Sequence, residues 1–205
     1  MKIKTLFFLL ILSISVKLSG QDSLAETRQG IFVGLGAGTW FPDNKNKVLG
    51  HPLMLDLRID YRKNRNSFSF NFDLVGLFIN KTTETVQVKL NDSIVKVNDF
   101  FGSQVTFDYG RVLYSKNRFS FEVNCGLGWG RLSYYNPTVD IDIGKSSFIL
   151  NSGLSFGLYV GKRDLLQLKT QYYISDYRLN DNLSTDFKGN FIEVKLMWTG
   201  TFKSW

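Results

Sequence analysis

The sequence predicts an all-β fold, an antiparallel up-and-down barrel of eight strands, and three observations support it. Apolar and polar residues alternate with a period of two along many segments, as in strands with one apolar and one polar face. Short and long polar connections alternate between these segments. After the first residues, polar residues interrupt every apolar run well before the 20 or so residues that a membrane-spanning helix needs.

The amino-terminal segment has a different character. Met1–Lys4 is basic and is followed by the apolar run Leu6–Val16, the pattern of a secretory signal peptide. We expect a signal peptide over residues 1–20, with cleavage after residue 25 as a second possibility. A short lead over 21–29 and a barrel over 30–205 complete the predicted organisation.

The eight predicted strands follow one another with regular connections. They span Gly30–Phe41, His51–Arg62, Ser67–Asn80, Phe100–Tyr114, Arg118–Arg131, Ser147–Gly161, Leu165–Arg178 and Asn190–Phe202. Short turns at 63–66, 115–117 and 162–164 alternate with longer loops at 42–50, 81–99, 132–146 and 179–189. This alternation is typical of outer-membrane barrels, and an even strand number places both termini on the periplasmic side.

The last predicted strand shows the alternation clearly. One of its faces is apolar and ends in an aromatic residue, and it carries Ile192, Val194, Leu196, Trp198 and Phe202. The third strand repeats the pattern, with Phe68, Phe70, Phe72, Leu74 and Phe78 opposite Ser67, Ser69, Asn71 and Asp73. A register slip of one residue would exchange the faces, so agreement between strands is informative.

The apolar faces are predicted to point outward, toward lipid, which makes the barrel transmembrane. Aromatic residues recur near strand ends and are interpreted as interfacial girdles: Trp40, Tyr61, Tyr109, Trp129, Tyr172 and Trp198. Arg111 and Arg131 lie on apolar faces near strand ends, where long side chains reach headgroups. A secreted, lipocalin-like calyx would have its apolar faces inward and is the alternative.

The pattern from residue 30 onward resembles the small eight-stranded outer-membrane barrels of the OmpA/OmpX type. The resemblance implies the outer membrane of a Gram-negative bacterium, with membrane lipids and lipopolysaccharide as its surroundings. It also implies that the barrel-assembly machinery recognises the last strand, although Lys203-Ser204-Trp205 extend this chain beyond Phe202. The short turns are all basic, which leads to the hypothesis that they meet lipid phosphates.

The predicted inner faces carry many charges: Asp56, Arg58, Asp60, Asp73, Asp108, Glu122, Lys169, Glu193 and Lys195. A barrel of eight strands is just wide enough for side chains to fill it. We interpret these residues as a structural network of ion pairs in a filled polar lumen, because buried charges need partners. An ion or proton path is the alternative. Glycines on the first and fifth strands would leave room for long side chains.

The connection 81–99 is predicted to form a hairpin around Asn91-Asp92. Its apolar positions are Val86, Val88, Leu90, Ile94, Val95 and Val97. The hairpin is interpreted as a solvated decoration, with a recognition edge for a surface protein partner as the alternative.

No catalytic, cofactor-binding or metal-binding residue is predicted. The chain has one histidine, His51, and one cysteine, Cys125, which provide no metal-site pattern. The net charge of +7 comes from 25 basic and 18 acidic residues and includes three lysines of the signal segment, so nucleic-acid binding is not expected.

The predicted function is that of a non-enzymatic outer-membrane barrel with a structural or surface-interaction role. The alternatives are the secreted calyx, a lipid-modifying outer-membrane enzyme that uses His51, and an accessory barrel of an export system. The sequence does not identify a ligand or an oligomeric state.

Overall fold

The structure is a computed structural model, and it describes residues 29–77, 81–90, 93–136, 141–160, 164–177 and 190–204. The predicted signal peptide (1–20), both cleavage positions and most of the lead lie outside the described residues. No helix within the described ranges is long and apolar enough to cross a membrane.

Nine strands and one short 3-10 helix make up the described chain. In order they are β1 (Gly30–Pro42), η1 (Asn44–Leu49), β2 (Leu53–Lys63), β3 (Asn66–Val75), β4 (Lys81–Leu90), β5 (Ser93–Lys116), β6 (Phe119–Asn136), β7 (Ile141–Val160), β8 (Asp164–Ile174) and β9 (Phe191–Ser204).

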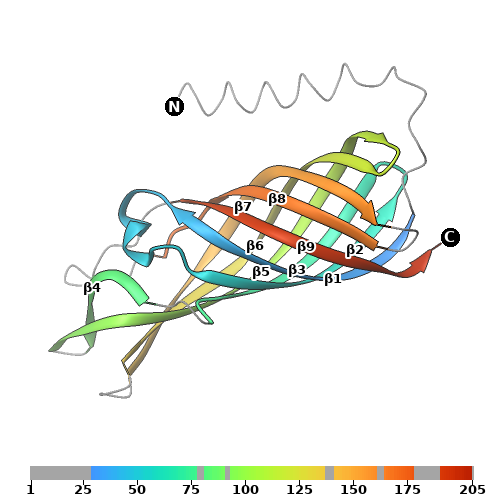
Figure 1. The fold of residues 1–205 in the computed structure, drawn as a ribbon. Coiled ribbons are helices and arrows are strands. Elements are labelled where there is room, and N and C mark those ends of the chain that lie inside the picture. Colours follow the sequence, from blue (N-terminus) through green and yellow to red (C-terminus); the bar gives the residue numbers. More distant parts are fainter. Residues whose placement is uncertain are drawn as a thin grey trace.

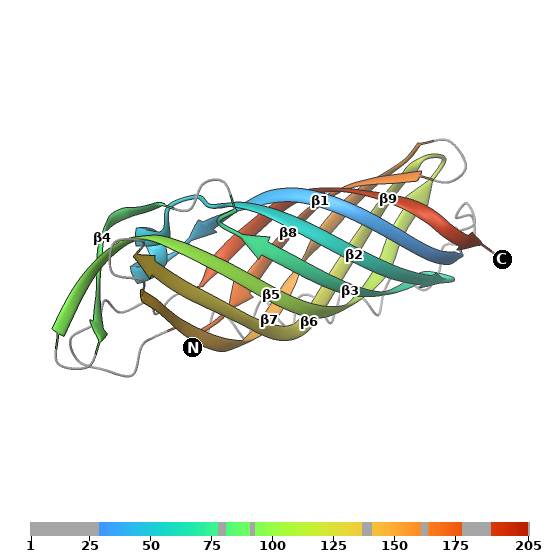
Figure 2. The same cartoon turned by 90° about the horizontal axis from the view of Figure 1, so that it is seen from below.

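Eight of these strands form the closed wall of a barrel (Figures 1 and 2). All neighbours are antiparallel, β1 pairs with β9, and β3 pairs with β5 across the connection that contains β4. β4 pairs with β5 alone and stands outside the wall. The predicted eight-stranded antiparallel barrel is therefore confirmed.

The barrel has two different ends. Gly30 pairs with Ser204, so both described ends of the chain lie at one end of the barrel, together with the turns after β2 and β5. We call this the short-turn end. η1 and the β4–β5 hairpin lie at the opposite end, which we call the long-loop end, and Figure 1 shows β4 and the carboxyl terminus far apart.

Two of the short turns have the same sequence and the same backbone. Lys63-Asn64-Arg65 and Lys116-Asn117-Arg118 each place an asparagine at positive φ, 54° for Asn64 and 55° for Asn117. Asparagine tolerates this left-handed conformation better than most residues. In both turns the arginine carbonyl accepts a 2.7 Å hydrogen bond from the next strand, from Val112 N–H and Tyr159 N–H respectively.

The strands at the long-loop end differ from the predicted boundaries. The predicted loop 132–146 is wrong, because β6 and β7 stay paired as far as Asn136 and Ile141. The alternation simply continues there, with Leu132 and Tyr134 pointing into the core. β3 ends at Val75 rather than Asn80, where Gly76 adopts a φ of 79° and its N–H donates to the Leu53 carbonyl over 2.9 Å.

The remaining strands agree more closely with prediction. The hairpin in 81–99 is confirmed, since β4 and β5 pair from Val86↔Val97 to Leu90↔Ser93. β8 ends at Ile174 instead of Arg178, and β9 runs from Phe191 to Ser204, slightly later than predicted.

Candidate functional site

The barrel wall separates an apolar outer surface from a polar interior. Leu35 on β1 and Trp198 on β9 are 66% and 64% exposed on the outer face, and many other large apolar side chains join them. The alternate positions are buried and include six carboxylates and four basic side chains among the described residues. A calyx has the opposite arrangement, so that alternative is excluded, and the outer surface is that of a membrane-spanning barrel.

The first group of interior charges surrounds Lys195. Its Nζ lies 2.6 Å from Asp56 Oδ2, 2.8 Å from Glu193 Oε1 and 3.1 Å from Asp73 Oδ1. Gln104 Nε2 donates to both Asp73 (3.2 Å) and Glu193 (3.0 Å). We call these five residues the Lys195 cluster. Three carboxylates meet a single ammonium here, and all four charged groups are buried.

The second group is centred on Asp108. Lys169 Nζ lies 2.5 Å from Asp108 Oδ2, and Asn71 Nδ2 donates to the same oxygen over 3.1 Å. Asn151 Nδ2 donates to Oδ1 over 2.9 Å, and Gln171 Nε2 to Oδ2 over 3.3 Å. We call this set the Asp108 cluster. It gives one buried carboxylate one cation and three amide donors, an arrangement that satisfies a buried charge.

The third group lies nearest the short-turn end. Arg62 Nε lies 2.6 Å from Asp60 Oδ2, and its Nη2 lies 3.4 Å from Glu122 Oε2. Arg58 Nη2 lies 3.6 Å from Asp60 Oδ2 and donates to Ser69 Oγ over 2.5 Å. We call these charged residues the Arg62 cluster. Arg58 Nη1 also donates to Gln167 Oε1 over 3.2 Å, so the cluster contacts β8.

Glycines provide space for these interior side chains. A Cβ atom on Gly38 would meet the Cβ of Lys195 at 2.6 Å, and one on Gly126 would meet the Cγ of Asp108 at 2.9 Å. A Cβ on Gly36 would collide with the sulfur of Met197. At Gly36 and Gly126, a side chain of the neighbouring strand therefore occupies the space that a Cβ would need.

An apolar cluster lies at the long-loop end of the interior. We call it the mouth cluster; it contains Trp40, Leu49, Met54, Val75, Val86, Val88, Val97, Phe100, Leu132, Tyr134, Ile149, Tyr173, Tyr177 and Phe191. Phe191 stacks between Trp40 and Tyr173, with ring centroids 4.2 Å and 4.8 Å away. Trp40 Nε1 donates to Glu193 Oε2 over 3.3 Å, which joins this cluster to the Lys195 cluster.

One predicted girdle residue is therefore misplaced. Trp40 is buried inside the barrel, because its position in β1 has inward parity and a stacking partner on β9. The other five predicted girdle residues are exposed on the outer face: Tyr61, Tyr109, Trp129, Tyr172 and Trp198.

The hairpin side chains proposed for recognition are divided between two environments. Val86, Val88 and Val97 are buried in the mouth cluster, and Val95 is half-buried against it. Ile94 is 50% exposed. The side chain of Leu90 lies outside the described part of the structure. The hairpin therefore uses one face to cover the barrel mouth and presents the other to solvent.

His51 has no catalytic surroundings in the described structure. Its Nδ1 lies 3.0 Å from the Trp40 carbonyl oxygen, and its ring lies 5.1 Å from the ring of Phe41. Among the described residues, no group of three or more histidine, cysteine, aspartate or glutamate side chains is arranged to hold a metal ion.

The structure brings together all nine charges assigned to the inner faces, in the three clusters above. Sequence reasoning missed Arg62 and the amides that complete each cluster, notably Gln104, Asn151 and Gln171. Parity provides the signal for Arg62, which lies two residues from Asp60 on the same face of β2. Parity also places the amides inside, but it does not show which carboxylate each one contacts.

The comparisons with known proteins identify the fold. No protein-family model matches this sequence, and no curated protein matches it. Among solved structures, Neisserial surface protein A (NspA) is similar with a TM-score of 0.61 and 14% identity, over 86% of this chain and 100% of that chain.

Two further solved structures have lower similarity. The N-terminal β-barrel domain of Pseudomonas aeruginosa OprF has a TM-score of 0.49 and 11% identity, over 86% of this chain and 100% of that chain. Yersinia pestis Ail, in complex with the heparin analogue sucrose octasulfate, has a TM-score of 0.48 and 15% identity, over 87% and 100%. The similarity to NspA, at 14% identity, supports the fold alone, that of a small antiparallel β-barrel.

Proposed function

We propose that this chain is an integral outer-membrane barrel whose interior is closed by its own side chains and whose role is structural or surface-interacting rather than enzymatic. The observation that carries the proposal is the distribution of side chains on the wall, which is the reverse of that in a soluble barrel: apolar side chains lie outside and paired charges lie inside. Bacterial outer membranes hold barrels of this kind. The fold shared with NspA supports the same location.

The closed interior is supported by the order of the clusters along the barrel. From the short-turn end, β3 meets the clusters in turn: Ser69 contacts the Arg62 cluster, Asn71 belongs to the Asp108 cluster and Asp73 to the Lys195 cluster, and Val75 belongs to the mouth cluster. Tyr173 Oη lies 3.2 Å from both Gln171 Oε1 and Glu193 Oε1, which links the last three groups. Because the interior charges are paired and the rings beyond them are stacked, we favour a plug over an ion or proton path.

A non-enzymatic role is supported by the surroundings of His51. The two partners of its ring in the described structure are a backbone carbonyl and a phenylalanine, and neither activates a nucleophile. The titratable groups with dense contacts lie inside the wall and are buried.

The surface role is assigned to the long-loop end. We place this end outside the cell and both termini in the periplasm, as the long connections and the even number of wall strands suggest. The exposed face of the β4–β5 hairpin, including Ile94, is then the surface offered to a protein partner. Membrane lipids and lipopolysaccharide surround the wall, and the assembly machinery reads the outward face of β9 through Leu196, Trp198 and Phe202.

The test combines fractionation, gel mobility and conductance of the full chain. We expect the protein in the outer-membrane fraction, a shift in gel mobility on boiling, and no steady conductance in planar lipid bilayers. A soluble protein without a shift would overturn the barrel in the membrane. Steady conductance would overturn the closed interior, and loss of acyl-chain turnover in His51→Ala would overturn the non-enzymatic role. A stable co-purifying export complex would favour the accessory-barrel alternative.

A further inference from the structure

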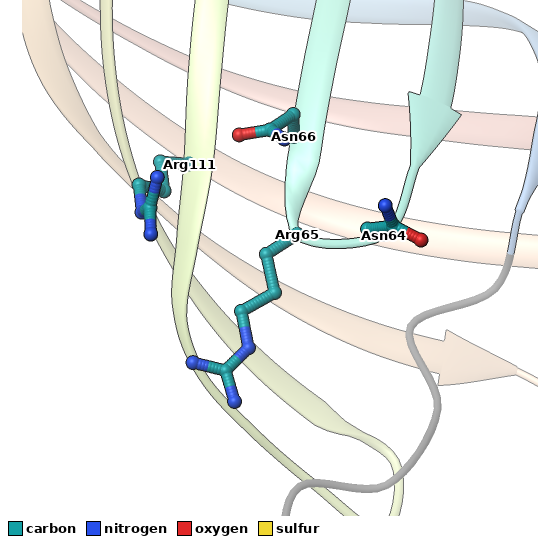
Figure 3. A pocket seen from close by; sticks show the side chains of 4 residues that line it. All are labelled: Asn64, Arg65, Asn66 and Arg111. Carbon is teal, nitrogen blue, oxygen red and sulfur yellow. The ribbon is translucent and has the colours of Figure 1, made fainter. Parts of the chain in front are cut away.

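An open pocket of about 380 Å³ lies on the surface at the short-turn end. Its lining comes from the turn between β2 and β3 and from the neighbouring strand β5: Asn64, Arg65, Asn66 and Arg111. Figure 3 shows Asn64 and Arg65 in the turn, Asn66 at the start of β3, and Arg111 beside them on β5. The pocket lies outside the polar interior described above.

Two arginine side chains line this pocket. Arg65 is half-buried and Arg111 is exposed, and Asn66 pairs with Arg111 in the β3–β5 register. Within the described residues, neither arginine forms an ion pair with a carboxylate. An anion bound in the pocket would be attracted by both positive charges. Arginine presents planar donors that match phosphate oxygens in pairs.

A row of aromatic rings lies directly beside the pocket on the outer face. Tyr61, Phe68 and Tyr109 are opposite one another on β2, β3 and β5, and all three are exposed. The ring centroids of Phe68 lie 6.4 Å from Tyr61 and 5.4 Å from Tyr109. Tyr109 Oη donates to Asn66 Oδ1 over 2.7 Å, which connects the aromatic row to the pocket. A ligand that fits both features has an anionic head and an apolar tail.

We propose that this pocket binds the phosphate of a phospholipid, with the acyl chains lying against the aromatic row. The inference rests on the proposed function, because the short-turn end must lie at the headgroups of a membrane leaflet. Free phosphate has the same chemistry at the arginines but nothing to contact Phe68. The site adds a specific lipid position to a barrel that otherwise meets lipid with an unspecific apolar band.

The chain contains a matched control for this site. The turn Lys116-Asn117-Arg118 has the same tripeptide, the same positive φ and the same backbone hydrogen bond to the next strand. There the residues corresponding to Asn66 and Arg111 are Phe119 and Leu158, which pair with each other. This second turn therefore presents a single guanidinium beside apolar side chains.

The experiment measures lipid retention by the full chain purified in detergent. Native mass spectrometry would follow a titration with dioleoylphosphatidylglycerol for the wild type, Arg65→Gln, Arg111→Gln, the double variant and Arg118→Gln. We expect each pocket substitution to weaken lipid binding about fivefold, as for one basic charge near a phosphate surface. Arg118→Gln is expected to bind as the wild type does.

Three outcomes would overturn the inference. Equal weakening of lipid binding by Arg118→Gln would show that the lipid responds to general surface charge. Unchanged lipid binding in the double variant would show that the pocket is not the binding site. Competition by inorganic phosphate at the lipid's own concentration would identify a site for a free anion. Gel mobility before and after boiling separates this from the proposed function. If the wild type shifts on boiling and the variants retain lipid, only the lipid site fails; if the wild type does not shift, the membrane barrel itself fails.

Discussion

Lys195 is the interior residue whose ammonium group has three carboxylate partners. Its ammonium is the one cation within 4.0 Å of Asp56, Asp73 and Glu193 among the described residues. All of these side chains are almost fully buried, so solvent provides little screening. Gly38 makes the arrangement possible, because a side chain there would meet the Cβ of Lys195.

We therefore expect Lys195→Met to destabilise the barrel by about 3–5 kcal/mol, the cost of leaving a buried ion pair without one partner. Urea unfolding in detergent, followed by tryptophan fluorescence, would measure the change. Lys203→Met, on the exposed end of the same strand, is the matched control and is expected to be near neutral. Equal stability of the two variants would contradict the role given to Lys195, and Lys195→Arg tests whether a cation alone is sufficient.

At the scale of elements, the β4–β5 hairpin is both part of the core and part of the surface. Val86 and Val88 on β4 and Val97 on β5 are buried against the mouth cluster, while Ile94 points away from it. Thr83 Oγ1 donates to the Val48 carbonyl over 3.1 Å, so η1 holds the hairpin as well. These hairpin contacts are therefore confined to the long-loop end, and the wall strands pair with one another independently of them.

Val88→Asp should detach the hairpin while the barrel wall stays closed. Burying an unpaired carboxylate in an apolar cluster costs at least about 2 kcal/mol. Because the hairpin contacts the mouth cluster through one face alone, we expect this cost to exceed the stabilisation that those contacts provide. Limited trypsin digestion would report this, through faster cleavage at Lys89 and Lys96 with the boiling shift retained. The exposed control Ile94→Asp is expected to digest like the wild type. Loss of the boiling shift in Val88→Asp would instead show that the hairpin holds the wall together.

At the scale of the whole molecule, the decisive feature is which face of the wall is apolar. Leu35 is 66% exposed near the middle of β1 and pairs with Leu57 and Trp198 on the adjoining strands. In a soluble protein such an exposed leucine accepts arginine with a change within about 0.5 kcal/mol. In a membrane barrel the same change places a charge in the hydrocarbon layer.

We predict that Leu35→Arg destabilises the barrel in lipid vesicles by about 2–4 kcal/mol, the cost of an arginine at the bilayer midplane. Reversible urea titration of folding into vesicles would measure it. Ile94→Arg carries the same new charge on the hairpin beyond the wall and is expected to be near neutral. Two equally small effects would contradict the membrane position of the wall.

Much of this architecture was predictable from local pattern. Parity placed Asp56, Lys169 and Glu193 inside and Leu196 outside, because successive strand residues face opposite sides. The alternation of short and long connections predicted the order of the strands, and the residues around Asn91-Asp92 predicted the hairpin. The prediction for Trp40 was wrong. An aromatic residue near a strand end was interpreted as a girdle residue, although Trp40 is buried inside the barrel.

The sequence by itself therefore determined the number and order of the wall strands, their faces and the closed antiparallel barrel, since these depend on a period of two and on the alternation of connections. Only the tertiary structure decided which interior groups meet. Lys195 contacts Asp73 across 122 residues of sequence, through a register that barrel closure between β1 and β9 sets. It also decided that the hairpin folds onto the mouth and that Arg65 and Arg111 share one pocket. The alternation of residues determines whether a side chain faces the interior or the lipid. Which side chains touch one another depends also on the strand register, and closure of the barrel sets that register.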